Sequence, residues 1–297
     1  MSRRETRTHG LGLGQISLAC VSLIFFGFLF ASDRAETPST QTPQDERVQT
    51  LKLQYPDPAT QDVLLALQGA NPAAFAQLEH ISRQGQLTDP TRRALLLEAL
   101  FGEFRTQAYA LQYADAKGYS GIIGQFAQGL ERLKANNSAW CEGPVMAEFL
   151  SQNDTDLVPS ILAELSYPSP QYDWAMAFMT VLLNTAHQAQ KTPIRHQPPG
   201  PYDETILQQA GLEFGTQNWG LAIQIAAFAQ AEGQSYAQMR EVISGIDVCE
   251  LGLALHSVSD RLPEPVRARL WADLMPQLML GNTPYALSRV MDYFFIG

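Results

Sequence analysis

The residues that could carry catalysis or bind a metal are scattered along the 297-residue chain. A zinc-peptidase helix needs two histidines four residues apart with a glutamate between them, and the sequence has no such pair. Gly118-Tyr119-Ser120-Gly121 is one residue short of a nucleophile elbow. Asp154-Thr155-Asp156 matches the D-x-D motif of some sugar transferases, but that motif stands at strand ends of an α/β sheet. We therefore predict no catalytic, cofactor-binding or metal-binding residue; the histidines beyond residue 35 are His80, His187, His196 and His256.

Carboxylates leave one enzymatic alternative open. A hydrolase or lyase can use two carboxyl groups as acid and base when their environments differ. Glu142, Glu164 and Glu250 have no spatial relation that the sequence defines. Glu142 and Glu250 each follow a cysteine, so a bond between those cysteines would bring the two carboxylates toward each other. An envelope hydrolase or lyase with a carboxylate-centred site is thus the alternative to a protein that acts by binding.

Cys141 and Cys249 are the two cysteines outside the apolar N-terminal segment described below. An even number of cysteines in an oxidising compartment permits one disulfide. Closing a loop of about 100 residues would stabilise the fold by about 4–5 kcal/mol in the chain-entropy model. The alternative is two separate buried thiols, and the absence of C-x-x-C disfavours a metal or redox site. We predict a Cys141–Cys249 disulfide.

An uncharged stretch over residues 11–32 follows three arginines, Arg3, Arg4 and Arg7. It is long enough to cross a bilayer, which takes about 20 apolar residues in a helix. The preceding positive charge places the N-terminal side in the cytoplasm. We therefore predict a cytoplasmic N-terminus over residues 1–10, a single-pass anchor over residues 11–32 and an exported remainder. The alternative is a cleaved secretory signal, which would also export the remainder.

The exported part is strongly acidic. The chain has 20 Lys and Arg and 30 Asp and Glu, of which four basic and two acidic residues lie within residues 1–35. The remainder holds 16 basic and 28 acidic side chains, a net charge of −12. A surface of that sign repels phosphate backbones, so we expect no nucleic-acid partner. Residues 33–56 are rich in Pro, Thr and Gln and are predicted to form a flexible linker, which leaves residues 57–297 as the main domain.

Residues 57–297 show helical patterns and no alternation of strand and helix. Six prolines stand at predicted first helical positions, five of them after a capping side chain such as Asp57, Asn71 or Asp89. Glycines such as Gly118 and Gly215 fall at predicted helix ends. We predict an all-α fold, an irregular multi-helix bundle with a solenoid-like stack as the alternative. The predicted helices cover residues 58–68, 72–84, 90–107, 109–117, 119–135, 143–152, 157–166, 170–190, 203–214, 217–231, 235–260, 263–279 and 284–295.

Two uncharged segments are predicted to form the centre of the core, residues 174–190 and residues 216–231. The second has apolar residues on every face, including Trp219, Leu221 and Ile223, which is typical of a buried helix. In the helix over 235–260 a narrower apolar seam includes Cys249, which should therefore point inward. The Pro-rich break over residues 192–201 is predicted to be a long loop. The apolar end Tyr293-Phe294-Phe295-Ile296 is predicted to dock back on the core.

These features predict a protein of the bacterial inner membrane whose main domain lies in the periplasm. Only four of the 20 basic residues are lysine, which is typical of GC-rich bacterial genomes. Because no catalytic motif is present, we expect a protein that binds another envelope or membrane protein as an accessory subunit, without a cofactor. The flexible linker would let the domain reach that partner at a distance from the bilayer.

Overall fold

The computed structural model describes residues 54–83, 87–149, 165–224, 241, 244–280 and 283–294. Within these ranges the regular elements are helices, so the predicted all-α, multi-helix fold is confirmed. One isolated antiparallel bridge joins Glu142 to Asp247. The predicted anchor over residues 11–32 lies outside the described residues. In the part of the chain that is described, no helix combines the length and the apolar character needed to cross a bilayer.

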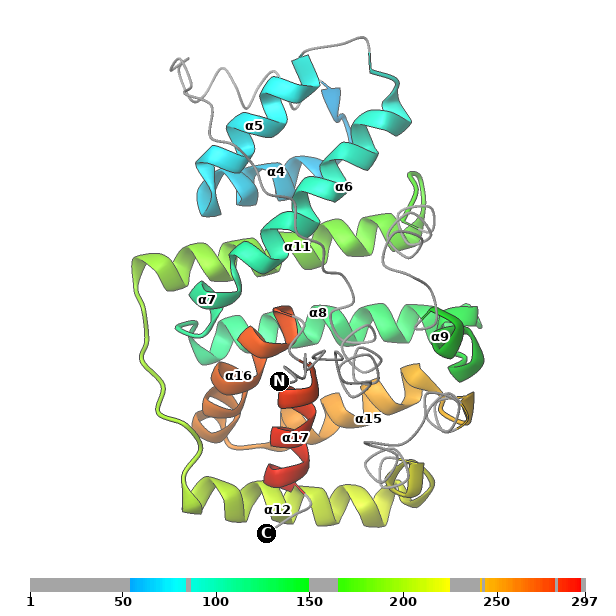
Figure 1. The fold of residues 1–297 in the computed structure, drawn as a ribbon, viewed down its shortest axis with the longest axis vertical. Coiled ribbons are helices and arrows are strands. Elements are labelled where there is room, and N and C mark those ends of the chain that lie inside the picture. The colour runs from blue at the N-terminus through cyan, green and yellow to red at the C-terminus, as the bar shows by residue number, and fades with distance from the viewer. Residues whose placement is uncertain are drawn as a thin grey trace, which may run out of the picture.

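Three helices form one end of the molecule along its longest axis (Figure 1). Asp57 caps the first of them as predicted, because its Oδ1 accepts a hydrogen bond from the Thr60 amide at 2.9 Å. Asp89, also predicted as a cap, instead lies inside its helix and binds Arg93 at 3.0 Å. The helices are α4 (Pro58–Ala70), α5 (Pro72–Arg83) and α6 (Asp89–Thr106).

The segment before α4 is held by a buried tyrosine. Tyr55 is fully buried, and its hydroxyl donates to the Arg92 carbonyl at 3.0 Å. Its own carbonyl accepts a hydrogen bond from Gln61 Nε2 at 3.1 Å. Tyr55 stands within the predicted linker of residues 33–56, and the structure packs this part of that range into the fold.

A short turn separates α7 (Ala108–Leu111) from α8 (Ala116–Ala135). The prediction that a helix ends at Gly118 is wrong, because Asp115 caps α8 and Gly118 lies in the first turn of that helix. The glycine is required by packing. A Cβ at Gly118 would lie 2.5 Å from Cγ2 of Thr185, so this residue marks a close approach of two helices.

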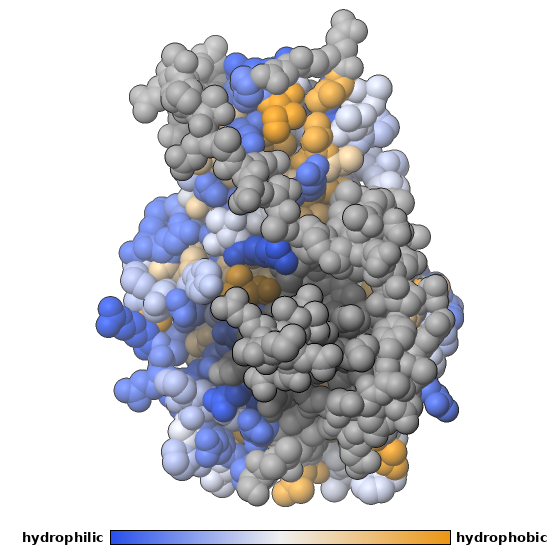
Figure 2. Space-filling model, in the orientation of Figure 1, coloured by the Kyte–Doolittle hydropathy of each residue, from blue (hydrophilic) through white to orange (hydrophobic). Residues whose placement is uncertain are grey.

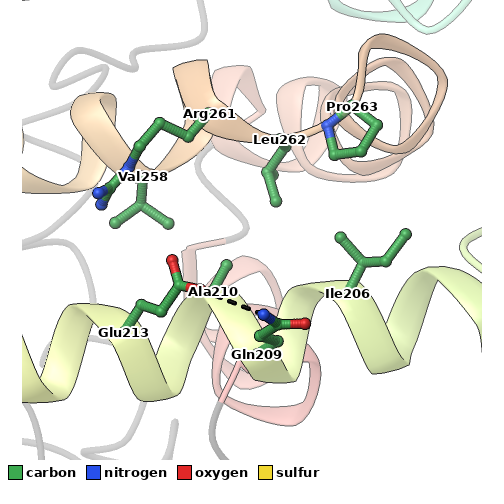
Figure 3. Close-up of a pocket in the computed structure, with 8 residues that line it drawn as sticks. All are labelled: Ile206, Gln209, Ala210, Glu213, Val258, Arg261, Leu262 and Pro263. Atoms are coloured by element: carbon green, nitrogen blue, oxygen red, sulfur yellow. Dashed lines mark hydrogen bonds between the residues drawn. The ribbon is translucent and has the colours of Figure 1, made fainter.

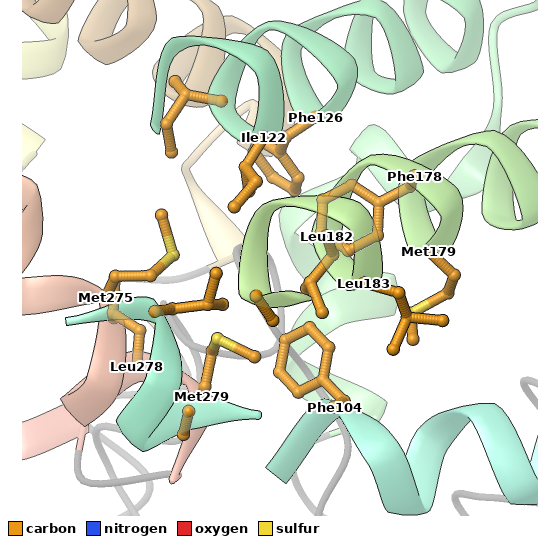
Figure 4. Close-up of a cluster of buried hydrophobic side chains, with 14 of the residues drawn as sticks. Phe104, Ile122, Phe126, Phe178, Met179, Leu182, Leu183, Met275, Leu278 and Met279 are labelled. Carbon is orange, nitrogen blue, oxygen red and sulfur yellow. The ribbon is translucent and has the colours of Figure 1, made fainter. Parts of the chain in front are cut away.

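The central helix is α11 (Pro170–Lys191), which lies between α4 and α8 (Figure 1). Its core position confirms the prediction for residues 174–190, and its buried side chains include Leu182 and Leu183. Side chains from α6, α8, α11 and a later helix, α16, meet in one apolar cluster (Figure 4). The labelled members are Phe104, Ile122, Phe126, Phe178, Met179, Leu182, Leu183, Met275, Leu278 and Met279.

An extended segment over residues 192–200 leads to α12 (Pro201–Gln217), as the Pro-rich break predicts. Gly215 does not end α12; the helix continues to Gln217 and is followed by a second helical stretch over residues 219–224. Trp219 is 69% exposed and Ile223 is 50% exposed, so their predicted core positions are wrong. The break at Asn218 redirects the chain, and Leu221 rather than these two side chains faces the core.

The predicted helix over residues 235–260 is also interrupted. A turn at Gly245 and an extended Ile246 precede α15 (Val248–Arg261), which is capped by Asp247 through the Glu250 amide at 2.8 Å. Cys249 is fully buried, as the apolar seam predicts. It lies against the short helix η1 (Ala139–Cys141), which is followed by α9 (Gly143–Phe149).

The chain returns through α16 (Glu264–Met279) and α17 (Thr283–Phe294). Tyr293 is 2% exposed, which confirms the predicted docking of the C-terminal segment at this residue; residues 295–296 lie outside the described part. Asp273 of α16 accepts hydrogen bonds from the Tyr293 hydroxyl at 2.9 Å and from Arg289 Nε at 3.3 Å. These contacts fix α17 on α16.

Candidate binding surface

The predicted disulfide between Cys141 and Cys249 is present and spans 108 residues of sequence. It joins η1 to α15, and both cysteines are buried. A bond in this position closes a long loop around the core, which is the arrangement in which a disulfide constrains the unfolded chain most. Disulfides of this kind are typical of extracytoplasmic compartments.

The carboxylates considered for catalysis do not form a buried site among the described residues. Glu142 and Glu250 are both exposed, although the disulfide brings their backbone segments together. Lys134 lies 3.9 Å from the Glu250 carboxylate, in a pair that solvent screens. Glu164 and residues 154–156 lie outside the described part of the chain.

Two of the histidines, His187 and His196, are held by separate contacts. His187 contacts Gly69 across the α4–α11 interface, where burial and then nearby Lys191 lower the pKa of the imidazole. His196 forms a 2.7 Å hydrogen bond with the Ala114 carbonyl. Over the described ranges, no three His, Cys, Asp or Glu residues are grouped so that they could hold a metal ion.

A buried arginine, Arg93, forms a polar cluster between helices. Arg93 donates to Asp57 at 2.8 Å and to the Tyr172 hydroxyl at 3.0 Å, and its guanidinium lies 3.5 Å from the centre of the Tyr167 ring. Burial alone would raise the pKa of Asp57, but hydrogen bonds from Thr60 and Arg93 outweigh it and lower that pKa. The Arg93 guanidinium is already bonded to partners within the fold. This cluster is therefore structural, and it holds α4, α6 and α11 together.

A groove lies between α12 and the junction of α15 with α16 (Figure 3). Its volume is about 180 Å³. The apolar side chains that line it are Ile206, Ala210, Val258, Leu262 and Pro263.

Three polar side chains line the same groove. Gln209 Nε2 donates to Glu213 Oε1 at 3.2 Å, as the dashed line in Figure 3 marks. Arg261 donates to Gln217 Oε1 at 3.1 Å. A groove with an apolar lining, one guanidinium and one carboxylate suits an aliphatic or aromatic side chain that stands next to a polar residue. It offers no arrangement of a nucleophile and a base.

One ion pair fixes α12 against the body of the protein. Both oxygens of Asp203 accept hydrogen bonds from Arg269 of α16, at 2.8 and 2.6 Å. These bonds outweigh the effect of burial and lower the pKa of the Asp203 carboxyl. Asp203 also accepts a bond from the Gly200 amide, so the same carboxylate caps α12. The helix therefore presents a defined outer face.

The exposed side of α12 and residues 219–224 is almost uncharged and mixes polar side chains, such as Thr205, Gln209 and Thr216, with large apolar ones. Four large side chains project from it: Tyr202 is 77% exposed, Leu212 73%, Trp219 69% and Ile223 50%. From Thr205 to Gln224 the one charged residue is Glu213. Figure 2 shows hydrophobic side chains reaching the surface at the end of the molecule that α12 forms. We call the four residues the α12 face.

Sequence reasoning missed this face. The absence of charge from residue 216 onward favoured burial, since apolar residues on all sides of a helix are typical of a core. The asparagine at position 218 was the available signal of a break, because asparagine is a weak helix former that competes for backbone hydrogen bonds.

Comparison of the chain with protein-family models, with curated proteins and with solved structures finds no match.

Proposed function

We propose that this protein is a membrane-anchored, periplasmic accessory subunit of the bacterial envelope that acts by binding another envelope protein through the α12 face. The observation that carries the proposal is the exposure of four large apolar side chains on α12 and the helical stretch over residues 219–224. An exposed apolar patch has an energetic cost in water, and burial against a partner relieves it. Trp and Tyr are the residue types that contribute most to protein interfaces.

The charge distribution supports a protein partner at this place. The exported part carries a net charge of −12, and like charges across an interface reduce affinity. From Thr205 to Gln224 the one carboxylate is Glu213, so a neutral apolar surface can approach the α12 face without that repulsion. The adjacent groove of about 180 Å³ offers room for one partner side chain beside the face.

The proposed location of the helical domain in the periplasm rests on two features. The Cys141–Cys249 disulfide fits an oxidising compartment, and residues 11–32 have the length and composition of a membrane anchor. Anchored in the inner membrane with a cytoplasmic N-terminus, the chain would hold its helical domain in the periplasm. The linker would then set the distance at which the partner is met.

The test uses the full-length protein, cross-linked in native membranes and purified in mild detergent. Leu212→Ser and Trp219→Ser change side chains that are 73% and 69% exposed, so we expect both variants to fold. We expect one envelope protein to co-purify with the wild type in a fixed ratio, and at least about tenfold less of it with either variant. The co-purified protein is quantified by mass spectrometry.

Leu65→Ser is the matched control, because Leu65 is 42% exposed on α4, away from the α12 face. Recovery of the partner with this variant, together with its loss from the two α12 variants, supports the proposal. Equal recovery with all three variants would overturn the role of the α12 face. Repeated isolation of the wild type as a lone monomer would overturn the accessory-subunit function.

A further inference from the structure

A second surface lies where the extended segment over residues 192–200 packs against α7 and the start of α8. Three contacts join these segments: Gln190 Nε2 donates to Gln107 Oε1 at 2.9 Å, the Ile194 amide donates to the Tyr113 carbonyl at 3.0 Å, and His196 bonds to the Ala114 carbonyl at 2.7 Å. The His196 ring also lies 5.8 Å from that of Tyr119 in α8. The surface is therefore formed by segments that lie far apart in sequence.

Three large side chains on this surface are open to solvent. Tyr109 is 64% exposed, Ile194 45% and Tyr113 37%. The backbone bond between Ile194 and Tyr113 joins the two segments that carry these side chains, and α7 carries the third, Tyr109, four residues before Tyr113. Two tyrosines and an isoleucine together form an amphipathic contact area of the kind that lies at membrane–water interfaces.

Three basic residues stand within four residues of these side chains in the sequence. Lys117, Lys191 and Arg195 are exposed, and none of them forms an ion pair within the described residues. Lys191 ends α11, Arg195 follows Ile194, and Lys117 stands in the first turn of α8 beside the close α8–α11 contact at Thr185. We name these three residues and Tyr109, Tyr113 and Ile194 the tyrosine–lysine patch.

Acidic residues are scarce in the segments that form the patch. From Trp174 to Tyr202 the sequence has no Asp or Glu, and from Phe104 to Leu130 it has one, Asp115. This is unusual in a part of the chain with a net charge of −12. The Asp115 carboxylate accepts a hydrogen bond from the Gly118 amide and caps α8. The patch is thus a local basic surface on an acidic protein.

We propose that the tyrosine–lysine patch binds the surface of an anionic phospholipid bilayer. Lys117, Lys191 and Arg195 would pair with phosphate headgroups, while Tyr109, Tyr113 and Ile194 would insert into the interfacial region. Each cation near an anionic leaflet contributes about 1 kcal/mol, so three cations give a weak and reversible contact. The acidic residues elsewhere on the domain act little at the patch, because salt screens charges beyond about 8 Å.

This inference rests on the proposed function in one respect, because it assumes the membrane anchor. A weak contact is enough when a short linker holds the domain at high effective concentration near the bilayer. Contact through this patch would fix the orientation of the domain on the membrane. The α12 face is a separate surface, so it would remain open to a protein partner.

The test measures how far a bilayer protects the patch lysines, Lys117 and Lys191, from acetylation. Full-length protein is reconstituted in bilayers of phosphatidylcholine, alone or with about one third phosphatidylglycerol. Surface amines are acetylated briefly and read by peptide mass spectrometry. Lys134 is the internal control, because it is half exposed at the opposite end of α8 from Lys117. We expect acetylation of Lys117 and Lys191 to fall about fivefold in the anionic bilayer only, to recover in about 0.5 M salt, and to stay unchanged at Lys134.

Variants separate the patch from non-specific effects. Arg195→Glu and Tyr109→Ser leave both probe lysines in place and should abolish the protection, whereas Arg132→Glu and Trp219→Ser, which change exposed residues outside the patch, should retain it. Equal protection in both bilayers, or equal protection of Lys134, would overturn the proposal. Protection seen in native membranes but not in protein-free anionic bilayers would overturn it in favour of an acidic protein. None of these outcomes depends on whether the α12 face has a partner.

Discussion

At the scale of residues, a few charged side chains act between helices that lie far apart in sequence. Arg93 connects the start of α4 with α11, and the Asp203–Arg269 pair connects α12 with α16. In both cases the anion is largely buried and its hydrogen bonds are short. Buried charges that are well paired orient the elements around them, and removing one partner leaves the other without compensation.

The Asp203–Arg269 pair should contribute measurably to stability. Asp203→Asn removes the charge of a carboxylate that is 5% exposed and accepts two bonds from Arg269. We expect the free energy of unfolding to fall by about 2 kcal/mol in urea titrations. Asp260→Asn is the control, because the Asp260 side chain is 70% exposed in its pair with Arg267 and should contribute less than about 0.5 kcal/mol. Equal losses in the two variants would contradict the structural role of Asp203.

The effect of Asp203→Asn should depend on pH. The pKa of Asp203 in the folded protein lies below its ordinary value of 3.8, so the unfolded chain binds the proton more readily. The stabilisation is therefore complete above pH 3.8 and is lost as the pH falls through the lowered pKa of the folded state.

We expect the difference in urea midpoint between wild type and Asp203→Asn to narrow as the pH is lowered from 6 to below 3.8. The wild type should lose more stability than the variant over this range. The variant should still lose some, because the pKa of Asp57 is lowered as well and that residue is unchanged. A gap that stays constant over the whole range would contradict the lowered pKa of Asp203.

At the scale of elements, glycines allow helices to approach closely. A Cβ at Gly129 of α8 would lie 2.3 Å from Cε2 of Trp174 in α11. The Trp174 ring is held in place, because its Nε1 donates to the Gln125 carbonyl at 2.8 Å. Added volume at position 129 must therefore displace the ring or the helix.

Gly129→Ala should destabilise the protein by about 1–3 kcal/mol, measured by urea unfolding. Gly124→Ala is the matched control on the same helix, since a Cβ there has no atom within 4 Å. Alanine at an open helical position reduces the freedom of the unfolded chain, so this variant should gain about 0.5–1 kcal/mol. If both substitutions stabilised the protein, the tight α8–α11 contact would be refuted.

At the scale of the whole molecule, the disulfide and the two exposed surfaces define what the domain can do. The Cys141–Cys249 bond ties η1 to α15 beside the core. The α12 face and the tyrosine–lysine patch lie on different elements, which the segment over residues 192–200 connects (Figure 1). On the two proposals above, one surface would contact a membrane while the other contacts a protein.

Replacing both cysteines by serine should lower the free energy of unfolding by about 4–5 kcal/mol, because the loop of 108 residues would no longer be closed in the unfolded state. Urea unfolding of the oxidised wild type, the reduced wild type and the double variant measures this. The reduced wild type should unfold at nearly the same urea concentration as the variant. Equal midpoints for the oxidised and reduced wild type would show that the bond does not stabilise the fold.

The sequence by itself determined the features that depend on neighbouring residues. Proline and capping side chains set the starts of α4 and α11, because a helix N-terminus is stabilised by groups within three residues. The disulfide partners followed from there being two cysteines beyond the apolar segment. The all-α class followed from the helical periodicity and the lack of strand patterns.

The tertiary structure alone decided which apolar residues are buried and where helices approach each other. Trp219 and Ile223 match a core pattern, yet the break at Asn218 turns them to the surface. Gly118 looks like a helix end, yet it serves packing against Thr185. Ile194 and Tyr113 are joined by a backbone bond between segments that lie far apart in sequence. Burial and proximity depend on what packs against a helix, and local sequence does not contain that information.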